Sequence, residues 1–154
     1  MQQNFQNTSQ VKSLAKKFGF DFCGIAKATP LPEDARKLEK WLLQGKHGAM
    51  QYMENHFELR INPQQLVPGA KSVITLLKNY YPTEHQKDKS PKISKYAWGE
   101  DYHNVIRSQL KDFLQQIKLQ IGDIHGRGFV DSAPVLERTW AVKSGLGWIG
   151  KNGN

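Results

Sequence analysis

Short apolar runs alternate with amphipathic stretches along the chain, which predicts an α/β fold: a mixed sheet covered by helices on both faces, in a single compact domain. Two stretches carry this prediction. Residues 72–77 form a continuous apolar and β-branched run between turn signals, as expected of a strand at the centre of a sheet. Residues 102–121 repeat apolar side chains at helical spacing and form the clearest amphipathic helix.

The other elements follow from the same periodicities and from residues that start or stop helices. Proline in the first helical turn and glycine just after the last one mark helix ends, and Gly126 to Asp131 reads as a short strand. The expected elements are a helix over residues 9–18 ended by Gly19, a strand over 20–26, a helix opened by Pro30 and Pro32 and ended by Gly45, a short helix and loop over 47–63, a surface loop over 83–92, a strand over 126–131 and a helix from 132–134 to 144.

Composition indicates a basic, non-membrane protein. The 154 residues include 22 Lys and Arg against 14 Asp and Glu, a net charge of +8 that favours capture of a polyanion such as nucleic acid. No apolar run is long enough to cross a bilayer and no secretory signal opens the chain, so a cytoplasmic location is expected. The single cysteine, Cys23, excludes an intrachain disulfide and any multi-thiolate cluster of this chain alone, and the histidine spacing predicts no metal site.

Two stretches gather groups that could carry chemistry. Asp131 is expected at the end of a strand and before a helix, where ligand crevices form in α/β sheets, and it is a candidate catalytic acid; the alternative is that Asp131 or Ser132 only caps the helix. Residues 95–103 are dense in aromatic and charged side chains that could stack on a planar ring or a base. Their alternative role is structural, with Asp101 as a helix cap.

Residues 145–151 form a glycine-rich stretch. Its spacing matches a dinucleotide-binding fingerprint, but that fingerprint needs a preceding strand, and a helix is expected here. The glycines can instead bring main-chain amides close to a bulky polar cofactor, with Lys151 and Asn152 adding donors. Because no helix or strand follows this loop, the sequence is expected to be a piece of a longer protein.

Three motifs together resemble epoxyqueuosine reductases: KYAWGEDYH at residues 95–103, FVDSAPVLER at 129–138 and GLGWIGKN at 145–152. Their order and spacing also match, and RINP at residues 60–63 fits the same family. The resemblance therefore covers nearly the whole chain.

The resemblance implies an oxidoreductase of queuosine biosynthesis that reduces epoxyqueuosine to queuosine at the wobble position of tRNA. Cobalamin is the implied cofactor, tRNA carrying epoxyqueuosine is the implied partner, and the protein is expected to be a monomer. Residues 1–154 would be the N-terminal cobalamin-binding domain, followed by a domain with two 4Fe-4S clusters that donate electrons. Because Cys23 alone cannot hold such clusters, this chain alone is expected to be inactive.

The same resemblance assigns site residues. Asp131 matches the aspartate that donates a proton to the departing epoxide oxygen, provided that it is buried enough to hold that proton. Tyr102 and His103 are expected to touch the cofactor or the modified base. In relatives, the end of the glycine-rich motif contains a residue with a ring, whereas residues 150–154 of this sequence read GKNGN. The exact contact of this segment with the cofactor is therefore left open. The expected cobalamin contacts are Arg60, Ser94, Asp131, Trp148, Gly150, Lys151 and Asn152.

Two other functions fit part of the pattern. A cobalamin-dependent reductase related to reductive dehalogenases would share the cofactor but act on small molecules, which the surplus positive charge disfavours. A noncatalytic RNA-binding module would need only basic and aromatic residues, and it would leave the acid and the glycine loop unexplained.

Overall fold

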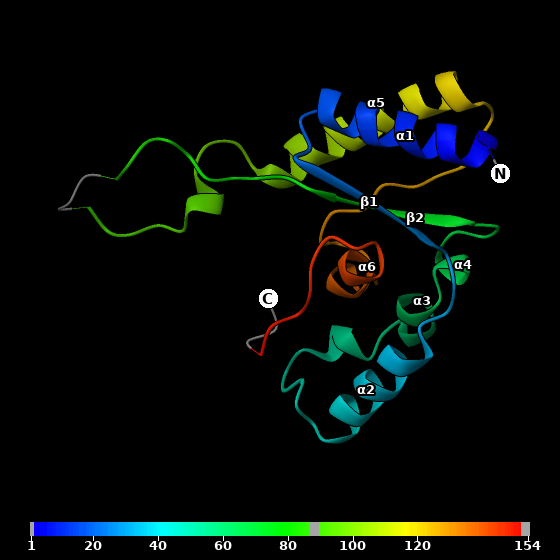
Figure 1. Cartoon of the computed structure of the whole chain (residues 1–154). Helices are drawn as coiled ribbons and strands as arrows, with labels where there is room; N and C mark the ends of the chain where they lie inside the picture. The colour runs from blue at the N-terminus through cyan, green and yellow to red at the C-terminus, as the bar shows by residue number, and fades with distance from the viewer. Residues whose placement is uncertain (1, 87–89, 152–154) are drawn as a thin grey trace. The chain divides into compact units, whose positions relative to one another are not determined.

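The computed structural model describes residues 2–86 and 90–151, and it confirms the predicted α/β class (Figure 1). The chain forms two compact units, and the division between them falls inside both strands. Unit 1 comprises Met1–Phe22, Leu76–Ile124 and Gly128–Asp131. Unit 2 comprises Cys23–Thr75, His125–Arg127 and Ser132–Asn154.

The sheet of the described residues has two strands, β1 (Phe22–Lys27) and β2 (Ser72–Leu77). They run antiparallel, since the Asp21 amide donates to Leu77 at one end and the Ala28 amide donates to Lys71 at the other. The strand predicted over residues 126–131 is wrong, because these residues lie in a loop, and β2 is therefore not central among the described strands. Two glycines within six residues weaken a strand there.

Unit 1 is built on helices α1 (Gln2–Lys17) and α5 (Tyr102–Ile121), which pack side by side, with the short 3₁₀ helix η2 (Lys95–Ala97) before α5 (Figure 1). Phe113 of α5 is 4% exposed and meets the rings of Phe18 and Phe20 edge-on at centroid distances of 6.1 and 6.0 Å. The helix predicted over residues 102–121 is confirmed. The buried apolar residues of this unit are Val11, Leu14, Ala15, Phe20, Phe113, Ile117 and Val130.

Unit 2 contains four α-helices and one 3₁₀ helix within its described residues: α2 (Pro32–Leu43), η1 (Gln51–Met53), α3 (Phe57–Ile61), α4 (Pro63–Leu66) and α6 (Glu137–Lys143). Its buried apolar residues are Ala28, Leu31, Leu38 and Trp140. A Cβ atom at Gly24 of β1 would lie 2.5 Å from the Ser144 hydroxyl and 2.8 Å from Leu146, so β1 approaches the end of α6 more closely than a side chain allows.

Helix boundaries follow local chemistry, but two helix starts differ from the sequence prediction, and α1 begins at Gln2 instead of residue 9. Gly19 and Gly45 take positive φ angles of 78° and 63° just after α1 and α2, as predicted. The helix expected from residues 132–134 begins only at Glu137, because Pro134 disfavours the helical conformation of the residue before it. In the described parts of the chain, every helix is too short or too polar to cross a lipid bilayer.

Candidate active site

Three side chains predicted as functional meet in unit 1, at the start of α5. The Tyr102 hydroxyl donates a hydrogen bond to Oδ2 of Asp131. Nε2 of His103 lies 3.7 Å from the same oxygen. The Tyr102 and His103 rings stack with centroids 4.0 Å apart, so each holds the other in place beside the carboxylate. We call Asp101, Tyr102, His103 and Asp131 the acid cluster.

Asp131 reaches the cluster from an irregular loop. Its φ angle is 52°, a left-handed conformation that is uncommon outside glycine but more accessible to Asp and Asn than to most residues. Val130 before it is 9% exposed and anchors the loop, whereas the Asp131 side chain is 48% exposed. The strand end expected to position Asp131 is therefore wrong, and so is the expected burial of its carboxyl group. A turn in the loop places it.

Asp101 begins α5 and contacts His103 twice. Its side chain accepts the main-chain N–H of His103 at 2.9 Å, which confirms the expected cap, and the same Oδ1 atom lies 2.8 Å from Nδ1 of the ring. These contacts, the main-chain one first, lower the pKa of Asp101, and Arg107 one turn further contributes. Sequence reasoning missed the contact with the ring, although the Asp-x-His spacing at a helix start could have indicated it.

Tyr102 is held in its neutral form. Its hydrogen bond to Asp131 raises its pKa from the ordinary 10.0 to about 12, because ionisation would break the bond and place a second negative charge beside the carboxylate. Tyr96 of η2 packs edge-on against Tyr102 at 6.0 Å between centroids and adds to this effect. At neutral pH Tyr102 therefore stays protonated and donates a hydrogen bond.

We expect an alkaline titration of phenolate absorbance to contain one tyrosine that ionises with a pKa near 12. Tyr102→Phe should remove that component, and Asp131→Asn should return it toward 10.0. Because the fold raises the pKa of Tyr102, its hydrogen bond to Asp131 stabilises the fold fully below pH 10.0. This contribution is lost as the pH rises through about 12. Tyr80→Phe is the matched control, and persistence of the high component in Tyr102→Phe would contradict the assignment.

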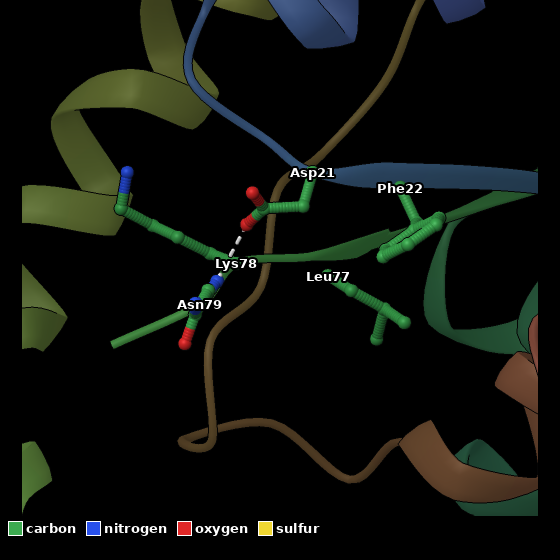
Figure 2. Close-up of a pocket in the computed structure, with 5 residues that line it drawn as sticks. All are labelled: Asp21, Phe22, Leu77, Lys78 and Asn79. Carbon is green, nitrogen blue, oxygen red and sulfur yellow. Dashed lines mark hydrogen bonds between the residues drawn. The ribbon is translucent and has the colours of Figure 1, made fainter. Parts of the chain in front are cut away.

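A hollow of about 310 Å³ also lies in unit 1, where β1 begins and β2 ends. Figure 2 shows these five lining residues: Asp21 and Phe22 where β1 begins, and Leu77, Lys78 and Asn79 where β2 ends. Asp21 accepts the main-chain N–H of Asn79 at 2.6 Å, which closes the end of the sheet (Figure 2). Lys78 donates to the carbonyl oxygen of Gly19 at 3.1 Å. The sequence motifs do not include these residues, and their bonds hold the strand ends together.

The other predicted cofactor contacts lie on different elements. Arg60 of α3 donates to the carbonyl oxygens of Tyr52, at 2.8 Å, and Asn55, at 3.4 Å, within unit 2. Ser94 is exposed in unit 1, where it precedes η2 and makes no capping hydrogen bond with its side chain. Asn152 lies outside the described residues.

The glycine-rich stretch after α6 is an open loop in unit 2. Trp148 is 85% exposed, Lys151 is also exposed and Gly150 is half-buried. Within the described residues, the main chain of residues 147–151 makes no hydrogen bond to other main-chain groups. A Cβ atom at Gly147 would meet nothing within 4 Å. The loop therefore presents main-chain amides and an indole ring to its surroundings.

Comparison with known proteins shows which family this chain resembles. Residues 60–132 match the family described as epoxyqueuosine reductase QueG, DUF1730. The epoxyqueuosine reductase of Cyclobacterium marinum is 58% identical over 96% of this chain and 48% of its own length. The chain resembles epoxyqueuosine reductases over nearly its whole length. It spans about half the length of the curated family members that it matches.

Solved epoxyqueuosine reductases share the fold. One, crystallised with an epoxyqueuosine-modified tRNA-Tyr stem loop, is 26% identical and superimposes with a TM-score of 0.82 over 97% of this chain and 40% of its own. The Bacillus subtilis epoxyqueuosine reductase is 25% identical, with a TM-score of 0.75 over 97% of this chain and 40% of its own. In that structure the catalytic loop, which is named for an aspartate, is swung out of the active site.

Proposed function

We propose that the chain supplies the catalytic acid and a cobalamin-binding loop to an oxidoreductase that converts epoxyqueuosine in tRNA to queuosine. The identity with epoxyqueuosine reductases over nearly the whole chain supports the reaction class. The structural relative that holds a modified tRNA stem loop supports tRNA as the substrate, and the net charge of +8 suits a polyanion. Cytoplasmic location and a monomeric state belong to the same proposal.

The observation that carries the role of this chain is the acid cluster. Reduction of an epoxide to an alkene takes two electrons and two protons and releases the oxygen as water. Charge builds up on that oxygen as its bonds to carbon break, and a carboxylic acid within hydrogen-bond distance neutralises it. Asp131 suits this role because Tyr102 orients one of its oxygens and His103 lies beside it. The aspartate-bearing catalytic loop of the Bacillus subtilis relative supports the same role.

The residues after α6 suit a large, polar, planar cofactor such as cobalamin. Unpaired main-chain amides within the described loop could bind the amide and phosphate oxygens of its side chains, and Trp148 could pack on an apolar face. Gly150, Lys151 and Asn152 complete the proposed contacts in this loop. When bound, cobalamin would supply electrons to the epoxide, and iron–sulfur clusters would supply electrons to cobalamin. Because Cys23 is the one cysteine of this chain, residues outside this chain would hold those clusters.

Arg60 and Ser94 are proposed as further cofactor contacts on other elements. Arg60 uses two of its five N–H donors on main-chain carbonyls, which fixes the guanidinium and leaves donors for an amide or phosphate oxygen. Ser94 offers an exposed hydroxyl. Either residue could therefore bind a cofactor side chain without losing a contact that holds its own element.

The test supplies the full-length protein with cobalamin, a low-potential chemical reductant and a tRNA stem loop bearing epoxyqueuosine. Nucleoside mass spectrometry should detect queuosine, and omission of cobalamin should abolish it. Stem-loop binding without conversion would instead indicate the RNA-binding module, and dehalogenation of a small organohalide without action on tRNA would indicate the related reductase. Either result would contradict the proposal.

A further inference from the structure

The acid cluster contains one residue, His103, that Asp131 does not need in order to donate a single proton. The Asp131 side chain is 48% exposed, and a proton that it donates must be replaced before the next turnover. Its neighbour Tyr102 cannot supply that proton near neutrality, because its pKa is raised to about 12. His103 is the remaining neighbour in the cluster, and imidazole exchanges protons in the physiological range.

Asp101 determines which nitrogen of His103 carries a proton. A carboxylate only accepts hydrogen bonds, so the 2.8 Å contact requires a proton on Nδ1. Nε2, the nitrogen facing Asp131, is then the site that gains and loses a proton as the imidazole changes charge. The charged and titratable groups facing the ring are Asp101, Asp131 and Tyr102, with Arg107 and Tyr96 acting on Asp101 and Tyr102.

We propose that His103 reprotonates Asp131 and that Asp101 is the positioning residue that sets His103 for this transfer. This inference rests on the proposed function and adds the source of its proton. Once Asp131 has given its proton to the departing oxygen, protonated His103 passes the Nε2 proton to the Asp131 carboxylate. The neutral ring keeps its Nδ1 proton on Asp101 and takes a new proton from water, which its 34% exposure permits.

The geometry suits this transfer. Nε2 and Oδ2 lie 3.7 Å apart, and a displacement of about 1 Å brings them to hydrogen-bond distance. The stacked Tyr102 ring limits how His103 can turn, and the main-chain bond from His103 to Asp101 fixes the base of the side chain. Asp101 therefore controls the ring from one end while Asp131 lies at the other.

Substitution of Asp101 can separate this role from helix capping. Asn and Ser start helices about as well as Asp, so both variants should keep α5. The short Ser side chain should not reach the imidazole, whereas Asn keeps a neutral acceptor there. For epoxyqueuosine reduction by the full-length protein, we expect Asp101→Ser to lower kcat by about 10- to 100-fold with KM unchanged, and Asp101→Asn to lie between. Glu100→Gln is the control.

The pH dependence provides a readout that a purely structural role would not change. The kcat ratio of wild type to Asp101→Ser should change with pH, because the proposed transfer uses the protonated ring and Asp101 contacts that ring. A ratio that stays constant with pH, or an unchanged kcat, would overturn the proposal.

Nitrogen-15 NMR of the imidazoles tests the positioning without any turnover. In neutral His103 the proton should reside on Nδ1 in the wild-type protein and shift toward Nε2 in Asp101→Ser; the His103→Gln spectrum assigns the signal. An Nε2-protonated ring in the wild type would overturn the role of Asp101. If the wild-type protein reduces no epoxyqueuosine, the proposed function fails, whereas the NMR result still decides whether Asp101 positions His103.

Discussion

Replacement of Asp131 with asparagine is expected to lower kcat for epoxyqueuosine reduction by about 10²- to 10⁴-fold, the usual contribution of a general acid. Asparagine tolerates the left-handed φ of 52° and can still accept the hydrogen bond from Tyr102, so the loop should keep its conformation. What is lost is the acidic proton. Single-turnover assays of the full-length protein with a modified stem loop would measure the effect.

The matched control is Asp123→Asn, which removes an exposed carboxylate from the same loop region outside the acid cluster. It should leave kcat unchanged. Cobalamin retention, followed by corrin absorbance after gel filtration, should be equal in both variants and the wild type. Normal turnover by Asp131→Asn would rule out a role as the acid, and equal losses in the two variants would indicate a general charge effect.

Phe113→Ala is expected to destabilise the protein by about 3–5 kcal/mol, because it removes a ring that is 4% exposed and leaves a cavity against Phe18 and Phe20. For a chain of this size the melting temperature should fall by roughly 2–4 °C for each kcal/mol. Circular dichroism during heating would measure the shift.

Leu119→Ala on the same helix provides the comparison, since Leu119 is 71% exposed. The two substitutions shorten apolar side chains on α5 at positions that differ in burial. A small shift for Leu119→Ala beside a large one for Phe113→Ala would confirm that the loss comes from the core. Similar shifts would contradict this, because alanine has the highest helix propensity and neither substitution should weaken α5 locally.

Local sequence signals predicted the elements whose stability depends on their own residues. Residues 102–121 form a helix as the apolar spacing and the Asp101 cap indicate, and residues 72–77 form a strand. The failures lie between Gly126 and Glu137. A six-residue apolar and glycine-rich run contains too little periodicity to distinguish a strand from a loop, and contacts with distant residues, such as Gly128 with Leu110, determine its path.

The acid cluster was predictable in its members and not in its geometry. Motif resemblance named Asp131, Tyr102 and His103, but Asp131 lies 29 positions from Tyr102, and sequence spacing does not show that their side chains share a hydrogen bond. The positive φ of Asp131 depends on its surroundings and has no local signature. Asp101 was recognised only as a cap because its second contact needs the orientation of the His103 ring.

The division of both strands between the two units affects how the chain can be made. Each unit is assembled from three separate stretches, and unit 1 includes Gly128–Asp131 as well as Met1–Phe22. During synthesis, the first residues of α1 must therefore wait until more than a hundred further residues have left the ribosome before their unit is complete. Such non-local closure slows folding. Exposed apolar surface during this wait gives chaperones an opportunity to bind the nascent chain.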